Sequence, residues 1–299
     1  MPELPEVETV RLRLAPVLVG NSFASVEQRR GDLRFPLPRH FAQRLQGRKV
    51  DALERRAKYL LARLDDGEVL VMHLGMTGRF SIDHNSSAQV APKNHEPGVF
   101  AHPQRHTPRH EHIVFHLVDG TAVRYSDTRR FGLMDLIAGE ALPTHALLKG
   151  LGIEPLGSDL TTDWLASRLK GKATAIKAAL VDQRLIVGLG NIYACEALFR
   201  AGVCPLRLAG TLATKTGKPT KATEALVKAV KSVLGEAIKA GGSSLRDYAH
   251  PDGGLGCFQH SFKVYGREGK PCRKKSCRGT VRRIVQSGRS TFYCPNCQR

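Results

Sequence analysis

The first stretch of the chain has apolar residues at the spacing of an α-helix. They recur at steps of three and four residues, at Val7, Val10, Leu14 and Leu18. Pro5 precedes all of them and Gly20 follows them, which suits the first turn of a helix and the position beyond its end. Pro16 interrupts the pattern in the last turn. The pattern therefore predicts an N-terminal helix with one apolar face.

Two pairs of apolar runs farther along the chain predict antiparallel hairpins. Residues 59–64 and 69–74 flank Asp65-Asp66-Gly67, and residues 113–118 and 121–125 flank Asp119-Gly120. Asp-Gly is favoured in tight turns because glycine accepts a positive φ at low cost. The first half is therefore predicted to combine one helix with antiparallel β layers. Between the hairpins, residues 81–109 are rich in His, Pro, Asn and Ser and are predicted to form an exposed loop.

After Gly150 the pattern becomes helical. Apolar spacing predicts short helices over residues 164–169, 176–185 and 192–199, and a longer helix over 224–240 that Gly241 and Gly242 end. The boundary between the β-rich and the helical part falls near residues 140–155. A third, small unit begins near Val264.

The charge balance indicates a polyanionic partner. The chain has 46 Lys and Arg against 27 Asp and Glu, a net charge of +19 at pH 7. Such a surplus favours nucleic acid or an acidic membrane surface. Nucleic acid is the better fit, because no apolar run approaches the roughly 20 residues of a membrane-spanning helix. The acidic, proline-containing start is unlike a secretory signal, so a reducing cytoplasm is the expected compartment.

Cysteine spacing near the end of the chain predicts a zinc site. Four of the seven cysteines lie in the last 28 residues, as Cys272-x4-Cys277 and Cys294-x2-Cys297. Two close pairs one hairpin apart can supply the four ligands of a tetrahedral zinc ion, and the alternative of two disulfides is disfavoured in a reducing compartment. Ten Lys and Arg against one Glu over residues 266–299 suit phosphate binding. The remaining cysteines are expected to be buried thiols, namely Cys195, Cys204 and Cys257.

The N-terminus carries a group that can act as a nucleophile. Pro2 follows the initiator methionine, and a small second residue generally permits removal of Met1. The secondary amine would have a pKa of about 7.7–8.0, so much of it is neutral near pH 7 and able to attack a sugar C1′ to form a Schiff base. The neighbouring Glu3 can act as an acid or base on the same sugar. From these residues alone, an ordinary helix start is the commoner explanation.

The complete set of motifs resembles one known family. The start Met1-Pro-Glu-Leu-Pro-Glu-Val-Glu-Thr9 is similar to the N-terminal signature of the formamidopyrimidine-DNA glycosylase family, also called the Fpg/Nei family. Further blocks resemble those of the family in the same order, and together they cover essentially the whole chain except residues 81–109. These blocks are Arg55-Arg-Ala-Lys-Tyr-Leu60, His73-Leu-Gly-Met-Thr-Gly78, Asp127-Thr-Arg-Arg-Phe-Gly132, Thr174-Ala-Ile-Lys177, Val187-Gly-Leu-Gly-Asn-Ile-Tyr-Ala194, Gly241-Gly-Ser-Ser-Leu245 and Thr291-Phe-Tyr-Cys-Pro-Asn-Cys297.

The resemblance implies an α+β, multidomain fold. It places an antiparallel β-sandwich with an N-terminal helix over residues 1–140, a helix–two-turns–helix DNA-binding domain over 150–262 and a zinc-finger β-hairpin over 264–299. The implied function is that of a monomeric, bifunctional DNA glycosylase and AP lyase of base excision repair, acting in the cytoplasm at the nucleoid. Its partner would be double-stranded DNA that contains oxidised purines (8-oxoguanine opposite cytosine, and formamidopyrimidines) or abasic sites. One structural Zn²⁺ is implied, with no redox or nucleotide cofactor and no membrane partner.

The catalytic roles of the family pass to matching positions of this chain. Pro2 would be the Schiff-base nucleophile, and Glu3 the proton donor that opens the deoxyribose ring. Lys58 would assist β-elimination, although without the resemblance it would be taken for a solvated strand lysine. Glu6 matches a second acidic position, and Arg289 would donate a proton during δ-elimination.

Three side chains would fill the space that an everted nucleotide leaves in the duplex. Met76 and Phe131 would wedge between base pairs, and Arg129 would hydrogen-bond the orphaned cytosine. Core packing is the alternative for Met76 and Phe131, but their glycine-rich loops make it the poorer fit. The resemblance also implies phosphate contacts for His110, Lys172, Asn191 and Arg289.

Three other functions are weighed against this one. An endonuclease VIII-like member of the family would prefer oxidised pyrimidines, but Leu4 and Met76, with the Arg-Arg-Phe block, favour the purine-specific branch. A non-catalytic zinc-finger protein that only binds damaged DNA would not need Pro2, Glu3 and Lys58 together. An RNA-binding protein would be distinguished by competition with duplex DNA.

The chain departs from the family pattern at three places. Four residues rather than two separate the first cysteine pair, and the loop over 81–109 is longer. In the lesion-capping loop, residues 252–258, Gly254 and Cys257 stand where Lys and Tyr are commoner. If that loop reads the oxidised purine through backbone N–H groups, the altered residues would be tolerated. If its side chains read the base, the base preference or the rate would shift.

Overall fold

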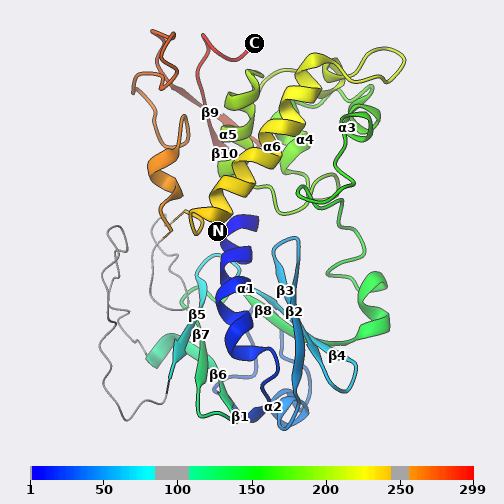
Figure 1. The fold of residues 1–299 in the computed structure, drawn as a ribbon, viewed down its shortest axis with the longest axis vertical. Coiled ribbons are helices and arrows are strands. Elements are labelled where there is room, and N and C mark those ends of the chain that lie inside the picture. Colours follow the sequence, from blue (N-terminus) through cyan, green and yellow to red (C-terminus); the bar gives the residue numbers. More distant parts are fainter. Residues whose placement is uncertain (1, 85–107, 244–255) are drawn as a thin grey trace. The chain divides into compact units, whose positions relative to one another are not determined.

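The computed structural model describes residues 2–84, 108–243 and 256–299, and the chain forms two units (Figure 1). The first unit comprises Met1–Lys149 and Ala240–Gln259, and the second comprises Gly150–Lys239 and His260–Arg299. The chain therefore returns to the first unit after the longest helix of the second. The division into three domains over 1–140, 150–262 and 264–299 stays a prediction.

Two four-stranded antiparallel sheets form a β-sandwich in the first unit. Side chains alternate between the two faces of a strand, so each sheet turns an apolar face toward the core. In spatial order, one sheet contains β1 (Phe23–Gln28), β6 (Glu111–Leu117), β7 (Ala122–Asp127) and β5 (Gly78–Asp83), and the other contains β2 (Val50–Arg56), β3 (Tyr59–Leu64), β4 (Glu68–His73) and β8 (Leu133–Ala138). The predicted α+β fold with an N-terminal antiparallel β-sandwich is confirmed.

Both predicted hairpins are present. Strands β3 and β4 are antiparallel neighbours with Tyr59 opposite His73, and Gly67 in their turn has a φ of +83°. Strands β6 and β7 are also antiparallel neighbours, and Gly120 between them has a φ of +86°. Glycine adopts such φ values without the steric penalty that a Cβ brings, which is why Asp-Gly marked both turns.

The N-terminal helix α1 (Leu4–Leu18) places its predicted apolar face in the core of the sandwich. Val7, Val10 and Leu14 are at most 1% exposed. The helix continues past Pro16, because a proline in the last turn removes only one backbone hydrogen bond and the N–H of Val19 still bonds to Ala15 O at 2.9 Å. A short helix, α2 (Phe41–Leu45), adds two buried side chains to the same core.

Four helices form at the predicted places in the second unit. They are α3 (Thr162–Leu169), α4 (Ile176–Val181), α5 (Asn191–Ala201) and α6 (Lys221–Lys239). The Thr161 hydroxyl caps α3 by accepting the N–H of Trp164 at 3.1 Å. Gly202, with a φ of +70°, ends α5. Buried residues along α6 recur at helical spacing, and this face packs against α5.

The predicted extent of the second short helix was wrong. Helix α4 ends at Val181 instead of running to Leu185, because the residues after it bond elsewhere. The Asp182 carboxylate accepts the N–H of Arg184, and the carbonyl of Leu185 accepts the N–H of Ile153 at 3.1 Å. Turn and bridge hydrogen bonds therefore replace the last helical turn.

The C-terminal residues form a hairpin of β9 (Arg282–Gln286) and β10 (Arg289–Tyr293). Its two-residue turn, Ser287–Gly288, has φ values of +48° and +71°, which are typical of the tight turns that match strand twist. The segment that leads to the hairpin is held by the buried carboxylate of Glu196 in α5. This carboxylate accepts three consecutive backbone N–H groups, from Lys263, Val264 and Tyr265.

Four 3-10 helices complete the described elements: η1 (Pro108–His110), η2 (Gly139–Thr144), η3 (Ala209–Leu212) and η4 (Phe258–Ser261). Among the helices that the structure describes, none is long and apolar enough to cross a membrane. Most of the predicted loop over 81–109 lies outside the described residues, although its beginning is strand, since β5 runs to Asp83.

We expect Gly132→Ala to destabilise the first unit. A Cβ at this position would lie 1.8 Å from Tyr125 Oη, 2.8 Å from His73 O and 3.1 Å from Asp127 Oδ2. Because the Tyr125 ring is fully buried, the free energy of unfolding measured with urea should fall by about 1–3 kcal/mol. In the control Gly31→Ala, nothing lies within 4 Å of the added Cβ, so the change should stay within about 0.5 kcal/mol. Equal effects of the two substitutions would show that crowding around Gly132 does not limit the stability of the unit.

Candidate functional site

The N-terminal residues are fixed by the way α1 begins. Pro2 is buried, and Glu3 is the N-cap of the helix. Glu3 and Glu6 form a capping box in which the N–H of Glu3 donates to Glu6 Oε2 at 2.9 Å. Both carboxylates are at most 3% exposed. The residue predicted as nucleophile therefore precedes a helix start whose two acidic groups are held in place.

The Glu6 carboxylate also binds the chain where it returns to the first unit. Its Oε1 accepts the N–H of Ser243 at 2.8 Å and the Ser243 hydroxyl at 3.0 Å. Gly242, with a φ of +76°, lies so near that a Cβ would be 3.1 Å from the same oxygen. Glu6 thus connects the helix start to the beginning of the segment that contains the lesion-capping loop. Residues 252–255 of that loop lie outside the described residues.

Lys58 follows a tight turn between β2 and β3. Ala57 takes a φ of +56°, and its carbonyl accepts a hydrogen bond from Arg55 at 3.0 Å. Arg55 also forms an ion pair with Glu8 of α1 at 2.8 Å, which ties this turn to the N-terminal helix. Lys58 is only 7% exposed, so the interpretation as a solvated strand lysine was wrong. Burying an ammonium group is costly, and such lysines commonly serve a site.

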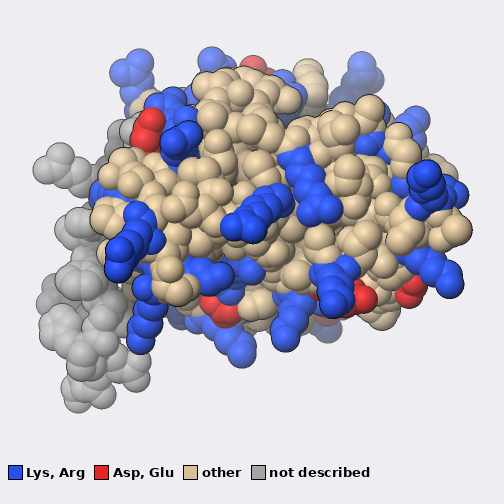
Figure 2. All heavy atoms as spheres, turned by 90° about the horizontal axis from the view of Figure 1, so that it is seen from above, with Lys and Arg blue, Asp and Glu red and all other residues tan. Residues whose placement is uncertain are grey.

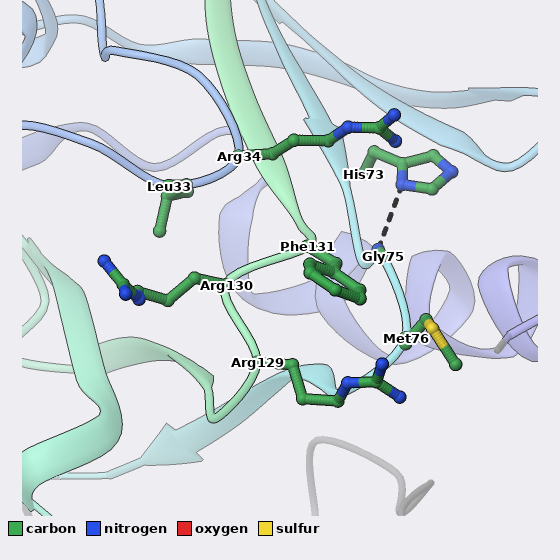
Figure 3. Close-up of a pocket in the computed structure, with 8 residues that line it drawn as sticks. All are labelled: Leu33, Arg34, His73, Gly75, Met76, Arg129, Arg130 and Phe131. Atoms are coloured by element: carbon green, nitrogen blue, oxygen red, sulfur yellow. Dashed lines mark hydrogen bonds between the residues drawn. The ribbon is translucent and has the colours of Figure 1, made fainter.

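A pocket of about 520 Å³ brings together the three side chains predicted to fill the duplex (Figure 3). Met76 comes from the loop after β4, and Arg129 and Phe131 come from the loop after β7. The Arg129 guanidinium lies 4.6 Å from the centroid of the Phe131 ring. Met76 and Phe131 are 37% and 42% exposed, so neither belongs to the core. Single exposed apolar side chains are ordinary, but here two of them line one pocket together, as is typical of a binding surface.

Two further residues of this pocket were missed from the sequence. His73 ends β4, and its Nδ1 accepts the N–H of Gly75 at 3.0 Å, so a proton on this ring belongs on Nε2. Burial, and then the positive charges of Lys58 and Arg34, lower the pKa of His73 from 6.5 to about 4. Arg34 also lines the pocket, with its guanidinium toward His73 in Figure 3. The sequence did contain a signal for His73, because this histidine begins the motif over residues 73–78 and lies at the end of a predicted strand.

In the second unit, the finger hairpin is joined to the N-terminal ends of two helices. Asn191, at the start of α5, donates from Nδ2 to Ser290 O at 2.8 Å, next to the exposed Arg289. Lys177 of α4 is 3% exposed and donates to the Thr291 hydroxyl at 2.5 Å. The structure therefore brings Asn191 and Arg289 together. Lys177 belongs to a block noted in the sequence, but its burial against the hairpin was not foreseen.

The other two predicted phosphate contacts lie on short irregular segments. Lys172 is exposed in the turn before α4, where its carbonyl accepts the N–H of Gly210 at 2.9 Å. His110 is half-buried in η1, directly before β6. His110 is not among the residues that line the pocket of Figure 3.

The four cysteines of the C-terminal unit form one cluster. Their Sγ atoms all lie within 4.8 Å of one another, with 3.8 Å from Cys272 to Cys297 and 3.7 Å from Cys277 to Cys294. Zinc–sulfur bonds of about 2.3 Å in a tetrahedron place sulfur atoms about 3.8 Å apart, whereas a disulfide needs about 2.05 Å. The residues fit one structural Zn²⁺, as predicted, in spite of the longer first spacing.

The first cysteine loop shows how that longer spacing is accommodated. Arg273 donates to the carbonyls of His260 and Phe262, at 2.8 and 2.7 Å. The backbone N–H groups of Lys274 and Gly279 point at Cys272 and Cys277, as is usual around zinc thiolates.

The expectation for the cysteines outside the cluster was only partly right. Cys195 is buried, Cys204 is half-buried and Cys257 is exposed. Cys257 pairs in an isolated antiparallel β-bridge with Ser243.

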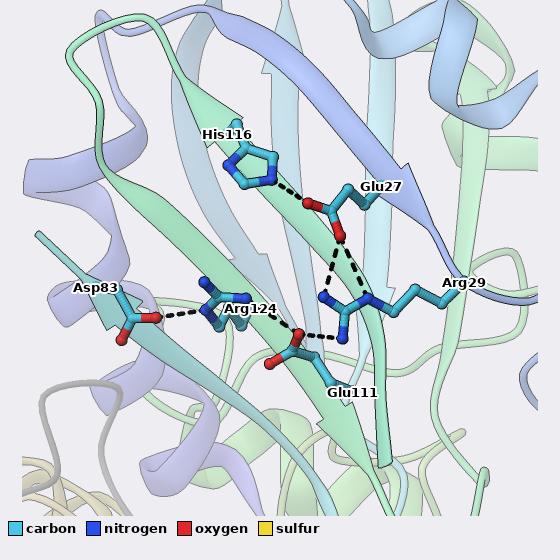
Figure 4. A network of polar contacts seen from close by, with 6 residues as sticks. All are labelled: Glu27, Arg29, Asp83, Glu111, His116 and Arg124. Atoms are coloured by element: carbon cyan, nitrogen blue, oxygen red, sulfur yellow. Dashed lines mark hydrogen bonds and ion pairs between the residues drawn. The ribbon is translucent and has the colours of Figure 1, made fainter. Parts of the chain in front are cut away.

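Not every arginine on the sandwich is available to a polyanion. Glu111, a buried residue of β6, forms ion pairs with Arg29 at 2.5 Å and with Arg124 at 3.1 Å (Figure 4). Asp83 and Glu27 extend this network on β5 and β1, and Glu27 also contacts His116 at 2.6 Å. The charges of these arginines are therefore balanced within the sheet.

Basic side chains nevertheless outnumber acidic ones on the face that Figure 2 shows. Figure 2 shows Lys and Arg spread over the whole face in view, with few Asp and Glu among them. Combined with the net charge of +19, this surface suits the phosphate backbone of nucleic acid. A β-sandwich unit, a helical unit and a basic four-cysteine hairpin together define a zinc-finger DNA-binding protein.

The chain belongs to the formamidopyrimidine-DNA glycosylase family. Three family models match it: the formamidopyrimidine-DNA glycosylase N-terminal domain over residues 1–134, the H2TH domain of the same enzyme over 151–249, and the zinc finger found in FPG and IleRS over 269–299. The resemblance inferred from the motifs is therefore confirmed.

Curated relatives and solved structures agree with this assignment. The chain is 58% identical over 299 residues to the formamidopyrimidine-DNA glycosylase of Beijerinckia indica, with 100% of both chains covered. It is similar to the crystal structure of the MutM (Fpg) protein of Thermus thermophilus, with 39% identity and a TM-score of 0.80 over 99% of this chain and 98% of that one. A mutant Lactococcus lactis Fpg in complex with DNA containing Fapy-dG matches with 31% identity and a TM-score of 0.80, covering 100% of each chain.

We expect the cysteine cluster to hold about one zinc ion per chain. Cys294→Ser removes one of the four ligands that the C-terminal segment offers to zinc, so zinc content and duplex binding should both fall sharply. Metal analysis and a binding titration on the same preparations measure this. Cys204→Ser is the matched control, because Cys204 is not part of the cluster, and it should keep its zinc. Zinc retained in full by Cys294→Ser would refute the four-cysteine site.

We also expect His73 to make the first unit sensitive to acid. Its folded-state pKa of about 4 lies below the ordinary 6.5, so the neutral ring contributes stability that is complete above pH 6.5 and is lost as the pH falls toward 4. Between pH 7.5 and 4.5 this loss should amount to about 2 kcal/mol. In His73→Gln the decline in urea-measured stability over that interval should be smaller by this amount. An identical decline in both proteins would show that another group is responsible.

Proposed function

We propose that this protein removes oxidised purines from double-stranded DNA in base excision repair, as a bifunctional glycosylase and AP lyase that uses its N-terminal proline. The observation that carries this proposal is the buried helix start, where Pro2 directly precedes the capping box of Glu3 and Glu6. Burying carboxylates is costly, and this helix start keeps two of them directly after the proline that would supply the amine.

The proposed chemistry begins with the secondary amine of Pro2, freed by removal of Met1. Its lone pair attacks C1′ of the damaged nucleotide, the base leaves with the electrons of its glycosidic bond, and the nitrogen loses its proton. The C1′–O4′ bond then breaks as the nitrogen lone pair forms the C=N double bond, and the freed ring oxygen takes a proton from Glu3. The resulting iminium ion acidifies the C2′ hydrogen. Loss of that proton expels the 3′ phosphate in β-elimination, and a second elimination expels the 5′ phosphate.

Lys58 and Arg289 support the elimination steps in this proposal. The buried Lys58 ammonium, which acts electrostatically on His73, would bind a phosphate near the lesion and help to move the proton from C2′. Arg289 is exposed at the first position of β10, from where it can reach a phosphate, and it would assist δ-elimination. Zinc has a structural part, since it holds the hairpin that carries Arg289.

Binding of the duplex is assigned to exposed side chains on short loops. Met76, Arg129 and Phe131 would occupy the space of the everted nucleotide, and their shared pocket and exposure support this. Asn191, Lys172 and His110 would contact phosphates, and the glycine-rich turn before Asn191 gives access to backbone N–H groups at the start of α5.

The substrate class rests on the named relatives. Proteins 52–58% identical to this chain are named formamidopyrimidine-DNA glycosylase, and the similar Lactococcus lactis Fpg has been solved with DNA containing Fapy-dG or an abasic site. We therefore assign 8-oxoguanine opposite cytosine, formamidopyrimidines and abasic sites to this chain. We place the activity in the cytoplasm, at the nucleoid where its substrate lies.

Repair of oxidised pyrimidines is a second candidate function. The Lactococcus lactis Fpg, 31% identical to this chain, has also been solved with DNA that contains an oxidised pyrimidine. A duplex with such a lesion is therefore included in the experiment below.

Trapping with borohydride tests the proposed chemistry. Reduction of the iminium should link the native protein covalently to a duplex that carries 8-oxoguanine opposite cytosine. A form that retains Met1 has no free proline amine and should give no adduct, and Pro2→Gly should give at least about tenfold less, because its primary amine is differently placed and protonated. Pro38→Gly, in a loop of the sandwich, is the matched control and should trap like the native protein.

Three results would overturn parts of this proposal. Adducts of equal yield with and without Met1 would remove Pro2 as the nucleophile. Tight zinc-dependent binding without any adduct would reduce the protein to a binder of damaged DNA, and adducts with the oxidised-pyrimidine duplex alone would move it to the second candidate function.

A further inference from the structure

One buried carboxylate joins the two loops that carry the duplex-filling side chains. Asp127, the last residue of β7, is 0% exposed. Its Oδ1 accepts the hydroxyl of Thr77, which belongs to the loop of Met76. Its Oδ2 accepts the N–H of Gly132 at 2.8 Å, at the end of the loop of Phe131. A single side chain therefore bonds to both loops at once.

Thr77 completes this link in the other direction. Its Oγ1 accepts the backbone N–H of Arg129 at 3.0 Å, and the same N–H lies 3.3 Å from Asp127 Oδ1. The hydroxyl of Thr77 thus accepts from one loop and donates to the carboxylate that anchors it. These bonds hold the backbone of Arg129, and the side chain of the same residue is the one assigned to the cytosine.

All four groups around the carboxylate are donors. Besides Thr77, Arg129 and Gly132, the Tyr125 hydroxyl lies 3.3 Å from Asp127 Oδ2. Burial, and then the charge of Asp127, raise the pKa of Tyr125 well above its ordinary value, so this hydroxyl keeps its proton and donates. An ionised carboxylate accepts from all four, whereas an amide would turn an NH₂ group toward donors.

The loops are also in direct backbone contact. A Cβ on Gly75 would lie 2.3 Å from the carbonyl carbon of Phe131, and one on Gly78 would lie 2.3 Å from Leu74 O and 2.6 Å from Tyr125 Oη. Glycine at position 75 lets the two loops meet without an intervening side chain, and glycine at position 78 lets the first loop close against Tyr125 of β7. Contact this close leaves the loops little freedom to shift independently.

We propose that Thr77 and Asp127 are positioning residues that lock Met76, Arg129 and Phe131 into one preorganised unit and thereby set the preference for cytosine opposite the lesion. This inference rests on the proposed function, in which Arg129 contacts that cytosine. Preorganisation lowers the ordering cost when the unit enters the duplex, and it holds the Arg129 guanidinium where only the correct base satisfies it.

The test compares variants of Thr77 that keep or remove the hydroxyl. Single-turnover excision is measured on duplexes with 8-oxoguanine opposite cytosine and opposite adenine, and the ratio of the two rates is the readout. Thr77→Val removes both hydrogen bonds of this hydroxyl and should lower the ratio at least about fivefold, and Asp127→Asn should lower it about tenfold. Thr77→Ser keeps the hydroxyl and should stay within about twofold of the native ratio. Thr121→Val, at the other end of β7, is the matched control and should leave the ratio unchanged.

Borohydride trapping on a duplex with a preformed abasic site separates positioning from folding. Thr77→Val should trap nearly as well as the native protein, because Pro2 and its helix start are untouched. A ratio of excision rates in Thr77→Val equal to the native ratio would overturn the proposal. Equal losses of activity on both lesion duplexes and of adduct on the abasic duplex would also overturn it, because they indicate that less of the protein is folded. If Asp127→Asn does not fold, the comparison of Thr77→Val with Thr77→Ser decides whether the proposal holds. Failure of the unmodified protein to excise either lesion would instead overturn the proposed function on which this inference rests.

Discussion

The hydrogen bond from the N–H of Glu3 to the Glu6 carboxylate fixes the start of the first helix, and with it the group at the N-terminus. A chemical group at a chain end has no preceding residues to hold it, so its position is set only by the residues that follow. Directly after this bond, α1 buries an apolar face in the sandwich core. The side-chain ion pair between Glu8 and Arg55 then joins the helix to the strand that leads to Lys58. Burial raises the pKa of Glu8, but the hydrogen bonds from Arg11 and Arg55 outweigh it and keep the group ionised.

Three buried carboxylates share one structural role in this basic protein. Glu6, Asp127 and Glu196 are each buried, and each accepts backbone N–H groups from a segment that has no regular structure of its own. Glu111 is buried too, but it balances two arginines on the sandwich. Acidic groups thus organise loops and sheets from within, whereas Lys58 and Lys177 are the only buried Lys or Arg among the described residues. This arrangement gives a polyanion-binding surface without leaving the loops that carry function unsupported.

Sequence patterns predicted the elements with strong local signals. The helical spacing that begins at Val7, the two Asp-Gly turns and the cysteine pairs were all identified from neighbours in the chain. Strand β1 was not, because Phe23 is its only fully buried residue and its register is set by β6, almost 90 residues away.

The same difference between local signals and distant contacts applies to the residues of the site. Pro2, Met76 and Arg289 were found because motifs carried them, and their roles remain predictions. His73, Lys177 and Asp127 act through contacts with distant segments that no local pattern encodes. Lys58 shows the limit most clearly, since a strand lysine and a buried site lysine have the same neighbours in the sequence.

The path of the chain has a consequence for how this protein can be divided. It passes from one unit to the other at residues 149–150, 239–240 and 259–260. A unit is therefore not a single stretch of sequence, and no single cut separates the two. A fragment that stops before residue 240 would include the whole sandwich but lack Ser243, and the Glu6 carboxylate would lose two of its donors. Each unit is consequently a module of the folded protein but not of the gene, because two separate stretches of sequence encode it. Exchanging one unit between relatives would therefore require two grafts.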